Sequence, residues 1–395
     1  MSRPVSAARP LLLGAGILLV AFNMRPALTT VGPLIETIQA ATGLGTRGAA
    51  LLNTLPVLCI GLACVLGPLV IRRLGADRGV LLAVAIVTLG SGLRGFGGLG
   101  PLFAGACLAA LGIGLSGVLL PGLVKREFPT QVGRVTGLYT MVLCLGAAAG
   151  AGFSVPLTQA AGNWSTALGL WSVPALVATL AWLPFARAPD PAERAVRRRP
   201  LWRDRLAWQV TGFMGLQSSL AYIMFGWLPV VLHDRGLSAM EAGYVASLMS
   251  IGQAPFALVV PSLAARAKDQ RLFAMLLLGL AVVTILGLVF GPLGLALPFG
   301  MLLGGALGGL FGLGLTLIVL RARDTAGAAD LAAMSQSVGY TLASLGPLGF
   351  GLAHDLTGGW GASVALFCLI AGGALICSFW AGQNRTVGVP NPRDA

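Results

Sequence analysis

The residues with the clearest chemical potential stand together in the stretch Asn23-Met24-Arg25-Pro26, inside an apolar run that starts at Leu11. Arg25 follows Leu11 by 14 residues, which is about 21 Å of helix in a hydrocarbon layer about 30 Å thick. A guanidinium at that depth costs about 3 kcal/mol or more. Pro26 has no N–H, so the carbonyl of Phe22 loses its helical partner. This cluster indicates the wall of a water-filled cavity inside a helix bundle.

Arg25 has no evident carboxylate partner at membrane depth. All 13 acidic residues fall at the ends of the predicted helices or in loops, and Glu36 lies about 16 Å further along a straight helix. A buried cation without a fixed counter-ion favours an anionic or strongly dipolar ligand. The alternatives are that Arg25 extends to the nearer membrane interface or hydrogen-bonds to a neighbouring helix.

Other polar side chains on the predicted helices could complete a binding site with Arg25. Gln336 and Tyr340, for example, are four residues apart and share a helix face. Each such side chain could instead form a hydrogen bond between helices. The candidate substrate-binding residues are Arg25, Asn23, Asn53, Tyr139, Gln217, Tyr222, Gln253, Gln336 and Tyr340. The candidate proton-transfer residues, at outer helix ends, are Glu36, His354 and Asp355.

The composition is that of a polytopic membrane protein. Hydrophobic residues make up 56% of the 395 and charged residues 10%, whereas soluble domains carry about 25% charged residues. The six cysteines lie in apolar runs without metal-ligand spacing to either histidine, so we expect packing residues and neither a metal nor a cofactor. An enzyme is not expected, because no catalytic dyad appears at membrane depth.

Twelve apolar runs are long enough to span a membrane. We predict helices near residues 11–36, 48–70, 79–98, 100–123, 134–159, 165–186, 207–232, 242–264, 272–291, 294–320, 331–353 and 361–382. With the N-terminus inside, 22 of the 26 Lys and Arg residues fall on the cytoplasmic side, and the other four are Arg25, Arg47, Arg94 and Arg235. This asymmetry predicts cytoplasmic N- and C-termini. It also argues against nucleic-acid binding, because the excess positive charge is spread over every inner loop.

The two halves of the chain look like repeats in the same orientation. Gly162-Asn163-Trp164 and Gly358-Gly359-Trp360 are offset by 196 residues, and Arg126 and Arg321 by 195. We therefore predict an N-terminal six-helix bundle (1–186), a basic cytoplasmic linker (187–206) and a C-terminal six-helix bundle with a short cytoplasmic tail (207–395).

Several motifs carry a family likeness. They are Asn23-Met24-Arg25-Pro26-Ala27-Leu28, Leu55-Pro56-Val57-Leu58-Cys59, Leu120 to Pro129, Thr136-Gly137-Leu138-Tyr139-Thr140, Phe213 to Ser218, Ser337-Val338-Gly339-Tyr340 and His354 to Trp360. On these stretches the chain resembles the major facilitator superfamily, and within it the cyanate permease and 2-nitroimidazole transporter group. The resemblance implies two six-helix bundles related by a pseudo-two-fold axis. It also implies a central cavity lined by the first, fourth, seventh and tenth helices. By the same resemblance, Gly346-Pro347 and Pro156 are expected to permit the bends that alternating access needs.

The likeness has one departure, in the loop between the second and third helices. The superfamily's Gly-x-x-x-Asp-Arg-x-Gly motif aligns with Gly67 to Gly75, where Ile71 or Arg72 takes the place of the aspartate and Asp77 lies beyond the motif. The usual inner-gate salt bridge is therefore not evident from the sequence. Arg72 and Arg73 keep the basic character of the motif and are candidate gate residues.

Together these features predict a monomeric transporter in a bacterial-type cytoplasmic membrane. Its cargo is a small anionic or polar solute such as cyanate, moved by alternating access. Exchange, facilitated passage and protonation of the solute all remain open as coupling modes. The alternatives are an exporter of a neutral planar nitroheterocycle, and a channel-like or sensor protein without alternating access.

Overall fold

The computed structural model describes residues 8–186 and 201–387, and within them it leaves a few side chains undescribed, including those of Glu36 and Asn53. The described residues form helices and no strand. The first half contains α1 (Ala8–Asn23), α2 (Pro26–Thr29), η1 (Gly32–Leu34), α3 (Ile35–Thr42), α4 (Thr46–Leu74), α5 (Ala76–Leu93), η2 (Arg94–Phe96), α6 (Leu99–Glu127), α7 (Val132–Ala161), α8 (Trp164–Leu170) and α9 (Ser172–Trp182). The second contains α11 (Arg205–Asp234), α12 (Ala239–Ala264), α13 (Arg271–Phe290), α14 (Ala296–Arg321), α15 (Thr325–Ala343), α16 (Leu345–Thr357) and α17 (Trp360–Ala381).

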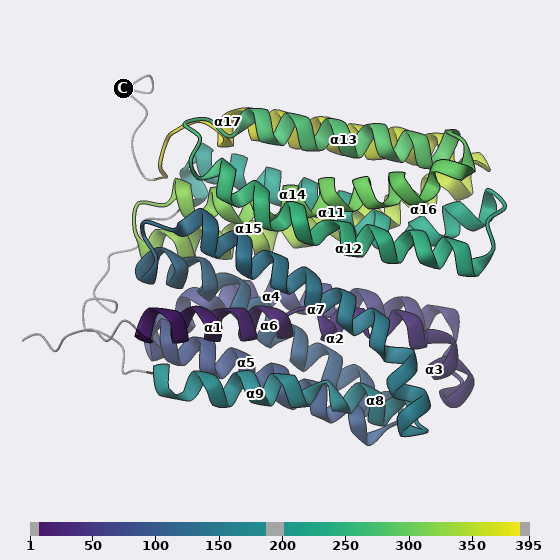
Figure 1. The fold of residues 1–395 in the computed structure, drawn as a ribbon, viewed down its shortest axis with the longest axis horizontal. Helices are drawn as coiled ribbons and strands as arrows, with labels where there is room; N and C mark the ends of the chain where they lie inside the picture. The colour runs from purple at the N-terminus through teal and green to yellow at the C-terminus, as the bar shows by residue number, and fades with distance from the viewer. Residues whose placement is uncertain (1–7, 187–200, 388–395) are drawn as a thin grey trace, which may run out of the picture.

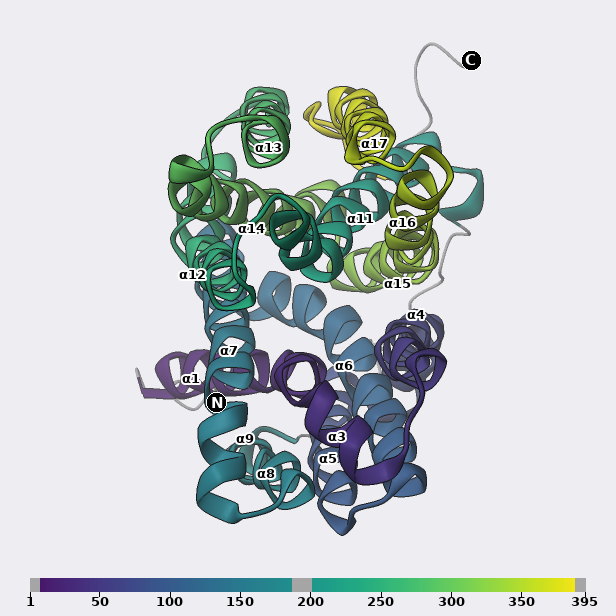
Figure 2. The ribbon, with the colours of Figure 1, turned by 90° about the vertical axis from the view of Figure 1, so that its right-hand side faces the viewer.

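The helices gather in two groups that lie side by side, α1 to α9 in one and α11 to α17 in the other (Figure 1, Figure 2). Within the described residues, 11 segments are long and apolar enough to cross a membrane. The pair α15 and α16 supplies a further segment between α14 and α17, in agreement with the predicted twelve spans. Residues 187–200 of the predicted linker lie outside the described residues, so the predicted domain boundaries stay predictions.

Three spans are broken, each just before a proline. α1 ends at Asn23 before Pro26, α8 at Leu170 before Pro174, and α15 at Ala343 before Pro347. A proline cannot donate to the carbonyl four residues earlier and its ring collides with that turn, so the helix ends there or bends. Of the two sites where bends are expected, Gly346-Pro347 lies at a break between helices, whereas α7 continues as one helix through Pro156 to Ala161.

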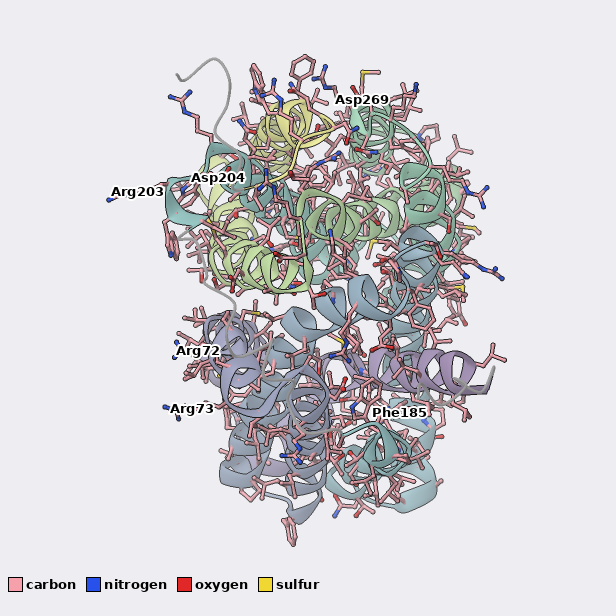
Figure 3. The ribbon with its side chains drawn as sticks, turned by 90° about the vertical axis from the view of Figure 1, so that its left-hand side faces the viewer. Arg72, Arg73, Phe185, Arg203, Asp204 and Asp269 are labelled. Carbon is pink, nitrogen blue, oxygen red and sulfur yellow. The ribbon has the colours of Figure 1, made fainter. Side chains whose placement is uncertain are left out.

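Basic side chains gather at one end of the molecule, which we call the basic end and define by Arg72, Arg73, Lys125, Arg126 and Arg203. Figure 3 views this end, with Arg72 and Arg73 on one half of the molecule and Arg203 on the other. Arg72 and Arg73 are exposed at the C-terminal end of α4. The membrane side that this end faces stays a prediction.

An ion pair at the basic end corrects the expectation drawn from the loop motif. Arg126, at the end of α6, pairs with Asp77 in the first turn of α5. The indole N–H of Trp182 in α9 donates to the carbonyl of Asp77 at 2.9 Å. The acidic partner exists, therefore, but it lies in the third span rather than in the loop before it.

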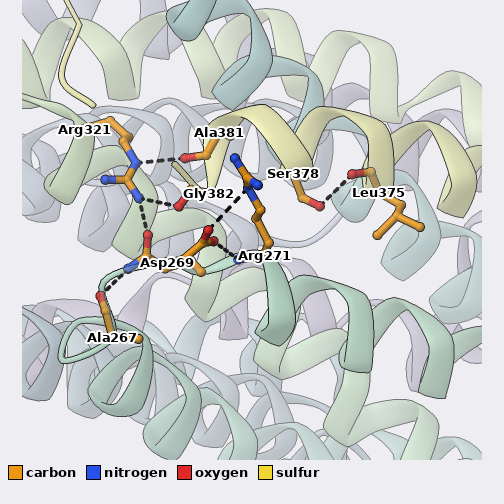
Figure 4. A network of polar contacts seen from close by, with 9 residues as sticks. Ala267, Asp269, Arg271, Arg321, Leu375, Ser378, Ala381 and Gly382 are labelled. Carbon is orange, nitrogen blue, oxygen red and sulfur yellow. Dashed lines mark hydrogen bonds and ion pairs between the residues drawn. The ribbon is translucent and has the colours of Figure 1, made fainter. Parts of the chain in front are cut away.

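The second half repeats this arrangement around Arg321, the last residue of α14. Its guanidinium donates to the side chain of Gln270, to the carbonyl of Ala381 at 2.8 Å and to that of Gly382 at 3.1 Å (Figure 4). Arg321 thus ties the start of α13 to the end of α17, as Arg126 and Trp182 tie α5 to α6 and α9. Gln270, at the start of α13, takes the place that Asp77 has at the start of α5.

The two halves make close contact near the basic end. Gly133 and Gly137 of α7 lie against the backbone of Pro261 and Leu258 in α12, so closely that any side chain would collide. Further along α7, Gly146 and Gly150 turn instead to α1 and α2 of their own half. The contact with α12 therefore follows the part of α7 nearest the basic end and closes the molecule there.

Candidate functional site

A cavity with about 490 Å³ of empty space lies between the two halves. Both halves contribute to its wall. Its lining residues are Met24, Arg25, Leu28, Ile60, Ile113, Gly117, Leu120, Tyr139, Leu143, Tyr222, Phe311, Leu315, Gln336 and Tyr340. A mainly apolar lining with a few polar groups is typical of a site for a small ligand.

Arg25 reaches the cavity because the first span is interrupted at its position. Asn23, two residues earlier, is buried and donates its amide N–H to the carbonyls of Leu19 at 2.9 Å and Pro174 at 3.1 Å. Thr29, on the other side of the break, donates to the carbonyl of Ala147 at 3.0 Å. The break is therefore anchored to α9 and α7, and Asn23 acts as an anchor rather than a lining residue.

The guanidinium of Arg25 faces aromatic groups. Its Cζ lies 5.1 Å from the centre of the Phe311 ring, which belongs to α14 in the other half. The Tyr139 hydroxyl is buried and has no hydrogen-bond partner. Tyr222 and Tyr340 meet edge to face with ring centres 6.3 Å apart. No Asp, Glu or His is among the described residues that line the cavity.

The floor of the cavity contains a hydrogen bond between the halves. Pro121 has no N–H, so the carbonyl of Gly117 lacks its usual partner in α6. The amide N–H of Gln336, on α15, donates to this carbonyl at 2.8 Å. The Tyr340 hydroxyl lies 3.3 Å from the Gln336 side-chain oxygen and donates to it. Two lining residues are therefore linked to the contact that holds α6 against α15.

A second hollow of about 300 Å³ adjoins the cavity. It shares Arg25, Tyr222, Phe311 and Tyr340 with the cavity and adds Gln217 and Gln253. The Gln217 amide nitrogen is occupied by the carbonyl of Met214 and the hydroxyl of Ser218, while its oxygen has no partner. The second hollow thus contains both an unpaired acceptor, the Gln217 side-chain oxygen, and the donor groups of Arg25.

Most of the predicted binding residues come together here. Those that line one or both hollows are Arg25, Tyr139, Gln217, Tyr222, Gln253, Gln336 and Tyr340. Asn23 lies elsewhere, as described above, and the side chains of Asn53 and Glu36 lie outside the described part of the structure. The structure places Arg72 and Arg73 on the surface of the basic end.

The two remaining candidates for proton transfer do not line either hollow. His354 stacks on Trp360, with ring centres 3.8 Å apart and planes 16° apart. Asp355 is exposed near the end of α16. In the described residues no group of three or more His, Cys, Asp and Glu side chains is placed to hold a metal ion.

Sequence reasoning missed two residues of the site, Phe311 and Gly117. Phe311 stands among the glycines of α14, in a stretch with no polar residue to draw attention to it. Gly117 carries the carbonyl that Pro121 frees. The signal in the sequence was the proline four residues after Gly117. The same reasoning had identified the carbonyl freed by Pro26.

Comparisons with known proteins agree with this architecture. The model of the Major Facilitator Superfamily matches residues 17–347. The chain is 38% identical over 373 residues to an uncharacterized transporter, YycB, of Bacillus subtilis (strain 168), covering 93% of this chain and 92% of that one.

Two relatives in Escherichia coli (strain K12) have named cargoes. A 2-nitroimidazole transporter is 36% identical over 390 residues, covering 98% of this chain and 99% of that one. The cyanate transport protein CynX is 31% identical over 364 residues, covering 91% and 94%.

Among solved structures, the proton:xylose symporter XylE superposes with a TM-score of 0.78 at 12% identity, covering 96% of this chain and 98% of that one. FucP in its outward conformation superposes with a TM-score of 0.74 at 13% identity, covering 95% and 99%. At such identities the likeness concerns the fold alone. The family match, the near-complete coverage and the two helix groups around a central cavity lead to one conclusion: this chain belongs to the major facilitator superfamily and is a multi-pass membrane transporter.

Proposed function

We propose that this transporter carries a small anionic or strongly polar solute, such as cyanate, and that Arg25 is its main binding group. The observation that carries this proposal is the position of Arg25 in a cavity whose described lining residues include no carboxylate. A guanidinium in such surroundings gains most from a ligand that brings negative charge. The unpaired hydroxyl of Tyr139 adds a neutral donor to the same cavity.

The mechanism we propose is alternating access. The cavity lies between the two halves, which pack tightly at the basic end. In the proposed mechanism the solute therefore enters this conformation from the opposite end. With both termini in the cytoplasm of a bacterial-type cell, the conformation faces outward. The charge gathered at the basic end supports that orientation.

A second candidate cargo is a neutral planar nitroheterocycle. The rings of Phe311, Tyr222 and Tyr340 favour it, because they present apolar surface on which a flat ring can lie. Gln217 and Gln253 supply polar groups for its substituents. The relative that transports 2-nitroimidazole supports the same class of cargo.

The test is uptake of labelled cyanate into liposomes that contain the purified protein, with 2-nitroimidazole as competitor. We expect saturable uptake that speeds up when unlabelled cyanate is inside. Arg25→Lys keeps the charge but loses the planar, two-pronged donor, so it should raise the cyanate KM at least tenfold. Unchanged uptake in Arg25→Lys would contradict the role of Arg25. Flux without saturation or trans-stimulation would contradict a carrier altogether.

A further inference from the structure

A second arginine of the first half is enclosed in the protein. Arg94 follows α5 at the start of η2, and its side chain is 0% exposed. The sequence interpretation had counted it among the cations outside the basic loops and gave it no role. Its stem instead packs against Gly105 of α6, where any Cβ would lie 2.7 Å from the Arg94 Cγ.

Arg94 holds the segment that follows Arg25. Its Nη1 donates to the carbonyl of Ala27 at 3.0 Å and to the hydroxyl of Thr30 at 3.2 Å. Ala27 belongs to α2, which has four residues. So short a helix is not stable by itself. The last carbonyls of a helix lack partners within it and attract a cation, and Arg94 supplies that cation.

Stability alone does not account for an arginine at this place. The Nε and Nη2 groups of Arg94 are buried and have no hydrogen-bond partner. Burying a charged group that is only partly hydrogen-bonded is costly, and well-packed apolar side chains often replace such groups without loss of stability. What an apolar residue cannot supply is the pair of bonds to Ala27 and Thr30.

We infer that Arg94 is a positioning residue for Arg25. By fixing α2 against α5 and α6, it sets the direction in which the interrupted first span presents the Arg25 guanidinium to the cavity. Asn23 and Thr29 anchor the same break to α9 and α7. Arg94 adds a third anchor, from the end of α5. This inference rests on the proposed function, in which Arg25 binds the solute.

A double-mutant cycle tests whether Arg94 acts through Arg25. The KM for cyanate is measured in liposomes for Arg25→Lys, Arg94→Met and the double variant. We expect Arg94→Met to raise KM about tenfold while its maximal rate changes less than twofold. Because the two residues serve one interaction, the double variant should be little worse than Arg25→Lys alone.

Arg235 is the matched control. It also donates to backbone carbonyls near the end of a helix, those of Leu288 and Gly291, both at 2.5 Å, but in the other half and away from the cavity lining. Arg235→Met should leave KM unchanged in either background. If the KM of the double variant rises by the product of the two single increases, Arg94 and Arg25 act independently. That result would overturn the inference.

A second measurement needs no solute. Hydrogen exchange of the backbone amides from Met24 to Val31 should speed up at least tenfold in Arg94→Met and stay unchanged in Arg235→Met. Unchanged exchange in Arg94→Met overturns the inference whether or not cyanate is a substrate. If Arg94→Met does not fold, Thr30→Val is used instead, because it removes the hydroxyl that accepts from Arg94 and keeps a similar volume. We then expect a severalfold rise in both the cyanate KM and the rate of amide exchange. A wild-type protein that ignores cyanate, with exchange behaving as expected, would overturn only the proposed cargo.

Discussion

At the scale of single residues, the polar groups around Arg25 differ in how far the protein already uses them. The Gln336 amide nitrogen donates to the carbonyl of Gly117, and the Tyr340 hydroxyl donates to the Gln336 side-chain oxygen. The hydroxyl of Tyr139 and the side-chain oxygen of Gln217 are buried without partners. Unpaired buried polar groups are unfavourable in an empty site, and a ligand that pairs them recovers that cost.

Tyr139→Phe removes a donor that a bound anion would use. Hydrogen bonds to charged groups contribute about 1.5–3 kcal/mol. The cyanate KM in liposomes should therefore rise roughly tenfold to a hundredfold. The thermal midpoint of the ligand-free protein should not fall, because the lost hydroxyl is unpaired there. Tyr244→Phe, at an exposed position on α12, is the control and should change neither quantity.

Arg25 could be predicted from the sequence because a charge at membrane depth is visible in the string of residues itself. The partners of Arg25 depend on the rotation of each helix about its axis, which the nearly uniform apolar sequence of α14 does not encode. Phe311 was missed for that reason. Asn23 was assigned to the cavity because it is near Arg25 in sequence, although two residues along a helix point in different directions.

At the scale of the elements, prolines accompany the interruptions of three spans, and one further proline frees a carbonyl through which one half bonds to the other. Pro26, Pro174 and Pro347 follow the three breaks. Pro121 leaves α6 continuous but frees a carbonyl, to which Gln336 donates. The contact between α6 and α15 beneath the site therefore depends on a backbone hydrogen bond that α6 lacks.

Gln336→Leu should destabilise the ligand-free protein by about 1–3 kcal/mol, because the carbonyl of Gly117 is left unpaired. Pro121→Ala returns an N–H to that carbonyl. In the Pro121→Ala background the same change at Gln336 should cost much less. Unfolding midpoints of the four proteins provide the measurement, and equal losses in both backgrounds would refute this account of the bond.

The number of spans could be predicted, because apolar length is a local property, and so could the irregularity at Pro26. The break before Pro174 could not, since other spans, such as α7 at Pro156 and α12 at Pro255, continue through their prolines. The Arg126–Asp77 ion pair could not, since the loop motif directed attention to Ile71 and Arg72 rather than to the next helix. The enclosure of Arg94 was equally hidden. The sequence places Arg94 near the end of the predicted helix 79–98, and only the packing of α2, α5 and α6 shows that its side chain is removed from water.

At the scale of the whole molecule, Lys125 links the two halves at the basic end. Its Nζ, on α6, donates to the carbonyls of Val319, at 2.9 Å, and Ala322. These carbonyls lie at the C-terminus of α14, where a cation is favoured by the helix dipole. The bond exists only while the basic end is closed, so it stabilises this conformation over the one open at that end.

Lys125→Met should therefore shift the population toward opening at the basic end. A cation at a helix C-terminus contributes about 0.3–1 kcal/mol, and up to about 2 when partly buried, which corresponds to a shift of roughly two- to thirtyfold. Spin labels at Arg134→Cys and Arg266→Cys, exposed on the two halves of this end, report the separation in a background without native cysteines. Lys268→Met removes an exposed charge from the same end and should leave the distances unchanged. Identical distances in Lys125→Met would contradict the role of Lys125.

The ring of Phe311 over Arg25 has a consequence for the unloaded protein. A carrier that delivers solute without taking any back must return its empty site through the membrane, with the guanidinium uncovered. Phe311 belongs to the opposite half, and a ring face at 5.1 Å offsets part of that charge by about 0.5–2 kcal/mol. Phe311→Leu should therefore slow net uptake severalfold more than one-for-one exchange of cyanate, and equal slowing of both would argue against it. An aromatic face in place of a carboxylate offsets part of the charge of the empty site without a competing negative group, and so bears on net flow more than on exchange.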